Sequence, residues 1–299
     1  MGCVNGVRRW WRDLGDLVLP GECAGCGRVR TVLCGACREE LSGVSARWVR
    51  PVGGPAGLPP VCAAGPYAGA VRGVLLAHKE RGALGLVGAL GEGLARAVGV
   101  GLDGTGVGEP AEVGAGVGEV CGRGPGRGGG VRAGAGTGEV RAGGGGVLLV
   151  PVPSGRGAVR ARGHDPVRRV ALAAAGVLRR RGAEVRVASV LRQRSGVLDQ
   201  AGLGYRERWE NLDGALRVSG AGARLLRGRA VVLVDDVVTT GASLAEAARV
   251  IGEACEGGGE EVSGGVALEG PDPVERRRRG VLCAAVVAGS PDSFEINRN

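Results

Sequence analysis

Two adjacent carboxylates and a hydroxyl-rich turn stand together in the segment VVLVDDVVTTGAS. Asp235 and Asp236 are followed after two valines by Thr239, Thr240 and Gly241. Neighbouring carboxylates accept hydrogen bonds from vicinal hydroxyl groups and help to hold a hydrated Mg²⁺. A turn with free N–H groups, threonine hydroxyls and a glycine admits a terminal phosphate. The two halves of the segment therefore fit a phosphorylated ribose.

The same segment predicts a strand, a turn and a helix in that order. Residues 231–234 are apolar without alternation, which is typical of a parallel strand buried on both faces. Ser243 stands at the expected N-cap of a helix, before the apolar positions Leu244, Ala247 and Ile251. An ordinary strand-turn-helix is the alternative interpretation, but a helix cap requires neither paired acids nor paired threonines.

Two CxxC pairs indicate a metal site near the N-terminus. Cys23 and Cys26 are separated by seven residues from Cys34 and Cys37. Four thiolates at this spacing close a tetrahedral shell around Zn²⁺, and such a shell leaves no position for a catalytic water. The sequence therefore predicts a structural zinc site, with reduced thiols that bind no metal as the alternative. The other cysteines are expected in the core or in loops.

A second anion-binding segment follows the predicted strand VLLVPVP at 147–153. It is predicted to be a loop rich in glycine and arginine that suits a diphosphate, and it includes Ser154, Arg162 and Gly163. Lys79 is the only lysine in a chain with 38 arginines. This choice of residue indicates either a position that requires an ammonium group or a solvated helix end.

The remaining pattern predicts an α/β fold, in which helices flank a mostly parallel sheet and ligands bind at the carboxyl ends of the strands. We expect a helix at 7–18, two helices in 67–99 broken near Gly82, and a helix at 167–181. Further strands are expected at 184–191, 216–218, 261–268 and 281–288. The predicted organisation is an N-terminal helix and four-cysteine module at 1–62 and a second domain at 63–299.

A glycine-rich insertion is expected at 101–146, where 20 of 46 residues are glycine. Such a segment buries too little apolar area to offset its ordering entropy, which predicts disorder. Its GxG patterns follow no strand and do not indicate a nucleotide loop.

Charge is concentrated in one part of the chain. Residues 151–230 contain 17 arginines against 6 acidic residues, a balance of +11, whereas the whole chain carries +9. This segment attracts phosphates, whether of a diphosphate or of single-stranded nucleic acid. No run of about twenty apolar residues predicts a membrane span, and the first residues lack the apolar core of a signal peptide. We therefore expect a cytoplasmic protein.

The order of these features resembles the ComF family, competence-associated proteins related to type I phosphoribosyltransferases. The segment VVLVDDVVTTGAS resembles their 5-phosphoribosyl-1-diphosphate (PRPP) signature. The cysteine module, the VPVP strand end and the position of Lys79 also match the family. Gln200, Leu203, Arg208 and Asn211 match its Q-x-x-L, R-x-x-N pattern. The resemblance covers the chain except the glycine-rich insertion.

The resemblance implies PRPP and Mg²⁺ as ligands and a type I phosphoribosyltransferase-like fold. The implied ribose ligands are Asp235 and Asp236. The implied 5′-phosphate site comprises Val238, Thr239, Thr240, Gly241, Ala242 and Ser243. The other implied PRPP-binding residues are Pro153, Ser154, Arg162, Lys79 and Arg208.

Two departures from the family pattern limit what the resemblance implies. The usual RG-F-N-Q run is Arg162-Gly163-His164-Asp165-Pro166 here, so that roles of the replaced side chains do not carry over. The second CxxC pair of many relatives is reduced to Cys62, which predicts one zinc ion.

Three functions remain open at this point. The first is Mg²⁺-dependent phosphoribosyl transfer with loss of diphosphate. The second is the handling of single-stranded DNA during uptake, which the basic segment suits; however, only Tyr205 and Trp209 lie in that segment to stack on bases. The third is a PRPP sensor that binds without reaction. The sequence leaves the oligomeric state open.

Overall fold

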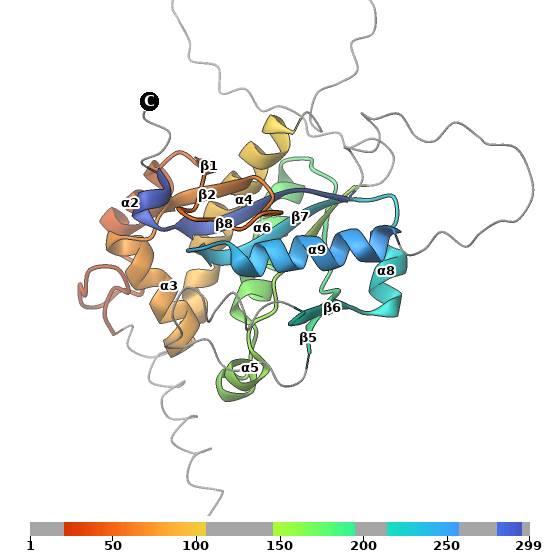
Figure 1. The fold of residues 1–299 in the computed structure, drawn as a ribbon. Coiled ribbons are helices and arrows are strands. Elements are labelled where there is room, and N and C mark those ends of the chain that lie inside the picture. Colours follow the sequence, from red (N-terminus) through yellow and green to blue (C-terminus); the bar gives the residue numbers. More distant parts are fainter. Residues whose placement is uncertain (1–20, 106–145, 195–213, 257–279, 295–299) are drawn as a thin grey trace, which may run out of the picture.

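A six-stranded sheet forms the centre of the fold (Figure 1). The computed structural model describes residues 21–105, 146–194, 214–256 and 280–294. The strand order is β1-β2-β8-β7-β3-β4, and neighbouring strands run parallel except for β1 and β2. The strands are β1 (Arg47–Val49), β2 (Val61–Pro66), β3 (Val147–Pro151), β4 (Val185–Val187), β7 (Ala230–Val238) and β8 (Gly280–Gly289). This confirms the predicted mostly parallel α/β architecture.

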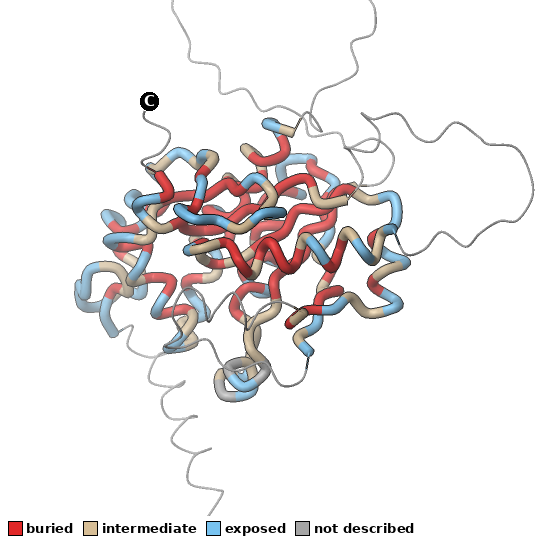
Figure 2. Tube along the Cα trace, viewed as in Figure 1, coloured by how far each residue is buried: buried red, intermediate tan, exposed pale blue. Residues whose placement is uncertain are grey.

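The central strands are buried on both faces, which explains their continuous apolar sequences. All five residues of β3 are buried, as are the first five of β7 and the last eight of β8. In Figure 2 the buried positions follow the strands and the inner sides of the helices beside them. The predicted strand at 281–288 is thus confirmed as β8, one residue longer at each end.

Helices cover both faces of the sheet. The first face carries α3 (Gly69–Arg81), α4 (Val87–Gly104) and α6 (Pro166–Arg180), whereas α9 (Ala242–Glu256) lies on the second face (Figure 1). The break predicted near Gly82 is confirmed, because Gly82 adopts a left-handed φ of 66° and ends α3. A short 3₁₀ turn, η1 (Leu84–Leu86), then leads into α4. At Gly91 a Cβ atom would lie 2.5 Å from that of Ala173, so a glycine allows α4 to approach α6.

Among the described residues, one helical segment is long and apolar enough to cross a membrane by length and composition. This segment, Leu84–Gly104, has a mean hydropathy of 1.3 and is 56% buried inside the fold. Leu90, Leu94 and Val98 are fully buried in the core beside the sheet. The helix therefore serves as a core helix.

Two predicted element boundaries differ from the structure. The helix α4 continues to Gly104, inside the range predicted as the glycine-rich insertion, because Gly101 and Leu102 are buried and Gly101 packs on Cys283. The predicted strand 184–191 divides into β4 and β5 (Leu191–Gln193). The chain leaves the edge of the main sheet near Ala188, and β5 pairs antiparallel with β6 (Leu216–Val218) in a second sheet. The predicted domain boundary at residue 62 falls inside β2.

The arginine-rich segment after β3 is a short helix rather than the predicted loop. This helix, α5 (Arg156–Arg162), ends at Gly163, whose φ is 76° and whose N–H donates to Val159 O over 2.8 Å. Gly163 is therefore a helix C-cap. Asp165 caps the next helix by accepting a hydrogen bond from Arg168 N–H at 3.1 Å.

Several sequence predictions lie outside the described residues. They are the helix at 7–18, the insertion beyond residue 105, the segment with Gln200, Leu203, Arg208 and Asn211, and the strand at 261–268. The short helix α8 (Gly220–Leu226) precedes β7, and the 3₁₀ turn η2 (Pro291–Phe294) follows β8.

Candidate functional site

The acid pair lies within the carboxyl-terminal part of β7. The sequence predicts that the strand ends before Asp235, but β8 continues alongside and pairs as far as Val238 with Gly289. Asp236 is 8% exposed and Asp235 is half-buried. Asp235 Oδ1 accepts a hydrogen bond from Asp236 N–H at 2.8 Å, and Asp236 Oδ1 accepts one from Val237 N–H at 2.9 Å. Strand pairing therefore holds the acid pair in place.

Lys79 forms an ion pair with this site. It lies in the last turn of α3, and its Nζ is 2.8 Å from Asp236 Oδ2. The Lys79 side chain is 38% exposed, whereas that of Asp236 is 10% exposed. Burial lowers the pKa of Lys79, but the charge of Asp236 and the hydrogen bond to it raise that pKa by more, so that it lies above its ordinary value. The sequence identified Lys79, and the structure identifies its partner.

Asp235 is the acid of this site whose surroundings oppose its ionisation. Burial and the negative charge of Asp236 raise the pKa of Asp235 well above its usual range, and Lys79 offsets part of this effect. A carboxylate pair of this kind is stabilised by further hydrogen-bond donors or by a cation. The site is therefore suited to a ligand that presents hydroxyl groups or brings a hydrated cation.

The hydroxyl-rich turn connects β7 to α9. Thr239 is exposed, and Thr240 Oγ1 accepts a hydrogen bond from Ala242 N–H at 3.3 Å. Gly241 has a φ of 81° and is buried against Leu58. The predicted N-cap role of Ser243 is wrong: the helix begins at Ala242, two residues earlier than a cap at Ser243 implies, because Ala245 N–H already donates to Gly241 O at 2.9 Å. Ser243 therefore belongs to the first turn of α9.

The predicted diphosphate residues divide into three groups. Pro153 and Ser154 follow β3 at the same edge as the acid pair, because Val152 N–H bonds to Val234 O at 2.9 Å. Arg162 at the end of α5 forms an ion pair of 3.1 Å with Glu80, next to Lys79. Arg208 lies outside the described residues. The structure thus brings two predicted cations, Lys79 and Arg162, to the acid pair's edge of the sheet.

Glu80 and the two histidines are parts of this edge that the sequence did not assign. The only sequence feature that could have identified Glu80 is its position next to the unique lysine, Lys79. His78 is 2% exposed, and its Nε2 lies 3.3 Å from Pro166 O. Its ring lies 5.9 Å from that of His164, centroid to centroid, so the two rings join α3 to the start of α6.

The four predicted metal ligands lie together. Their sulfur atoms are all within 4.8 Å of one another, and those of Cys26 and Cys34 are 3.6 Å apart. Zinc–sulfur bonds of about 2.3 Å place tetrahedral sulfur atoms about 3.8 Å apart, so this cluster fits a four-thiolate zinc ion. Cys34 precedes α2 (Gly35–Gly43), which carries Cys37, while a turn closed by the Cys23 and Arg28 backbones carries Cys23 and Cys26.

The local backbone favours one thiolate in this cluster. Burial raises the pKa of Cys23, but backbone N–H groups, first that of Cys34 at 3.3 Å, lower it to about 6. For Cys37, burial and the neighbouring sulfur atoms raise the pKa. A divalent cation supplies the charge that ionises all four thiols, and this donor set is the one that Zn²⁺ prefers.

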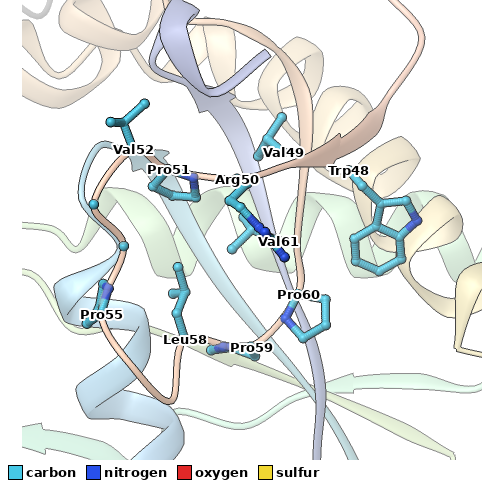
Figure 3. A pocket seen from close by; sticks show the side chains of 12 residues that line it. Trp48, Val49, Arg50, Pro51, Val52, Pro55, Leu58, Pro59, Pro60 and Val61 are labelled. Carbon is cyan, nitrogen blue, oxygen red and sulfur yellow. The ribbon is translucent and has the colours of Figure 1, made fainter. Parts of the chain in front are cut away.

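A cavity of about 940 Å³ lies in the connection between β1 and β2, lined by residues 48–55 and 58–61. Figure 3 shows the Arg50 side chain pointing into the space that this connection encloses. Most other lining side chains are apolar, among them Leu58, which touches Gly241 of the hydroxyl-rich turn. The cavity offers one charged group, whereas the acid pair and its cations offer several, and the chemistry of the site therefore lies at the acid pair.

Comparisons of the chain with protein-family models, with curated proteins and with solved structures found no match.

Proposed function

We propose that the chain is a ComF-like member of the phosphoribosyltransferase superfamily, which binds PRPP with Mg²⁺ and transfers its phosphoribosyl group. One observation carries the proposal: the acid pair is held in the carboxyl-terminal part of β7, two residues before a hydroxyl-rich turn into α9, and the only lysine of the chain contacts Asp236. An ion pair between Lys79 and Asp236 does not require a hydroxyl-rich turn beside it, whereas a phosphorylated ribose uses both the acid pair and the turn.

In this proposal each part of PRPP meets a different element. Asp235 and Asp236 accept hydrogen bonds from the two ribose hydroxyls, and residues 238–243 bind the 5′-phosphate through N–H groups and threonine hydroxyls. Donation by the ribose hydroxyls replaces the bond from Lys79 to Asp236. Lys79 is then available to the diphosphate, beside Pro153 and Ser154, and Arg162 lies next to it in its ion pair with Glu80.

The reaction breaks the bond between ribose C1 and the diphosphate oxygen, and an acceptor nucleophile forms the new bond at C1. Positive charge develops on the ribose and negative charge on the departing diphosphate. The carboxylates stabilise the first, and Lys79 and Arg162 stabilise the second. Mg²⁺, when bound with PRPP, supplies further charge for the leaving group.

The zinc site has a structural role in this proposal. All four ligand positions are occupied by Cys23, Cys26, Cys34 and Cys37, which leaves none for a reacting water. Cys23, Cys34 and Cys37 also belong to the hydrophobic core beside α3 and α4, whereas Cys26 is exposed.

Calorimetric titration with PRPP, with and without Mg²⁺, tests the proposed function. We expect saturable binding that Mg²⁺ strengthens and that D235N or D236N weakens about 10- to 100-fold, because each loses a hydrogen bond to a charged group. D103N is the matched control, since Asp103 is an exposed aspartate at the end of α4. Equal PRPP affinity in all three variants would contradict the proposal.

Two alternative functions, a PRPP sensor and a DNA-handling protein, predict different results. Binding of PRPP without release of diphosphate, across a panel of acceptors, would favour a sensor. A DNA-handling role draws on the many exposed arginines of the basic segment, such as Arg168, Arg180 and Arg217. That role predicts single-strand binding that weakens linearly on a log–log plot against salt.

A further inference from the structure

The four-cysteine cluster is packed tightly on the first half of α3. A Cβ at Gly73 of α3 would collide with the carbonyl oxygen of Ala24, between the first two ligands. A Cβ at Gly25 would lie 2.9 Å from that of Ala70 and 2.7 Å from Cys37 Sγ. Such contacts tolerate little rearrangement, so that the position of α3 depends on the shape of the metal-binding turn.

Glu40 forms a second link from this module to α3. It lies on α2, one turn after Cys37, and its Oε1 accepts a hydrogen bond of 2.8 Å from Ala70 N–H at the start of α3. The N-cap residue of α3, Ala68, makes no side-chain cap, and the first turn contains no acidic residue. Glu40 therefore supplies from another element the carboxylate that a helix N-terminus favours.

The other end of α3 carries Lys79. It lies nine positions after Ala70, which corresponds to about 13.5 Å along a helix. Because a helix of this length moves as a rigid unit, a displacement at Ala70 changes the position of the Lys79 ammonium at Asp236. One short helix thus connects the metal module to the acid pair.

We propose that Glu40 is a positioning residue. Through it the four-cysteine cluster and α2 fix the position of α3, and α3 in turn holds the Lys79 ammonium beside Asp236. Zinc binding and PRPP binding are then coupled, a consequence that rests on the proposed function. The ion pair itself depends on Glu40 and the cysteines whether or not PRPP is the ligand.

The unique lysine gives a direct test, because isotope-labelled lysine yields a single side-chain signal, from Lys79. D236N defines the position of that signal without the ion pair. We expect E40A, or removal of zinc from the wild type by a chelator, to move the signal toward the D236N position. E40Q keeps an acceptor oxygen and is expected to move it less.

Two controls separate positioning from general loss of stability. S219A removes the hydrogen bond from Gly222 N–H that caps α8, which lies on the opposite side of the molecule from α3 (Figure 1). E39A removes an exposed side chain next to Glu40. Neither is expected to move the lysine signal. Equal displacement in E40A and S219A, or none in E40A, would overturn the proposal.

PRPP titration of the same proteins distinguishes this proposal from the proposed function. We expect E40A to weaken PRPP binding about threefold or more, within the range of couplings carried through a rigid element. A moved lysine signal in a protein that does not bind PRPP would support the positioning role of Glu40 and contradict the proposed function. Unmoved signals with normal PRPP binding would contradict the positioning role alone.

Discussion

At the scale of single residues, the half-buried carboxylate of Asp235 is suited to ligand binding but lowers the stability of the ligand-free protein. Asp235 and Asp236 are adjacent, and one ammonium group, 38% exposed on its side chain, faces them. The sequence identified both acids and Lys79 by residue type. It could not identify the ion pair, because the partners are brought together by α3 and β7 across the fold, and no local pattern encodes that contact.

D235N is expected to stabilise the ligand-free protein while it weakens PRPP binding. The pKa of Asp235 is raised in the folded state, so its favourable contribution is present below the ordinary pKa of aspartate and is lost as pH rises through the folded value. The amide avoids this loss. We expect a gain of about 0.5–1 kcal/mol in the free energy of unfolding near pH 7.

Chemical denaturation of wild type and D235N across pH measures this effect. The difference in unfolding free energy should grow as pH rises from about 4 and then level off. A variant less stable than wild type at neutral pH would show that the ionised carboxylate stabilises the ligand-free fold.

At the scale of elements, predictions succeeded where burial dictates the sequence and failed where tertiary contacts decide. The apolar runs of β3, β7 and β8 and the break at Gly82 follow from local pattern alone. By contrast, α5 exists where glycines and arginines suggested a loop. The extra length of β7 depends on pairing with β8, which lies far along the chain. The start of α9 depends on one backbone bond to Gly241 O.

G241A is expected to damage the hydroxyl-rich turn. Its φ of 81° is unfavourable for alanine, and the added Cβ would lie 2.7 Å from a Leu58 methyl group. We expect a loss of about 1–2 kcal/mol in the free energy of unfolding, together with weaker phosphate binding. G252A is the matched control: it lies within α9 with open space around its Cβ, and is expected to be neutral or stabilising. Thermal unfolding compares the two, and a G241A variant as stable as G252A would contradict this role of the turn.

At the scale of the whole molecule, the metal module and the sheet share one core. The cysteine spacing predicted the ligands, and Cys62 and Cys283 are buried as expected of core cysteines. The predicted domain boundary at residue 62 lies inside β2. The structure instead continues from the module through β1 and β2 into the main sheet, since strand pairing with β8 is a long-range contact.

We expect the purified protein to bind one zinc ion per chain at the four clustered cysteines of the part that the structure describes. C37S should lower the zinc content and the unfolding temperature, because binding of a structural zinc ion contributes directly to folding. C255S is the control, since Cys255 lies on α9 outside the cluster. Elemental analysis and thermal unfolding check this, and full zinc content in C37S would contradict the four-thiolate assignment.

The proposed binding of a phosphorylated ribose at the acid pair is tested most directly by the Lys79 signal of isotope-labelled, zinc-loaded protein. Titration with PRPP and Mg²⁺ should move this signal saturably, because the ribose hydroxyls replace Lys79 as donors to Asp236. D103N should behave as wild type, and D236N should show a much weaker response. A Lys79 signal that stays in place at saturating PRPP would contradict the proposed ribose site.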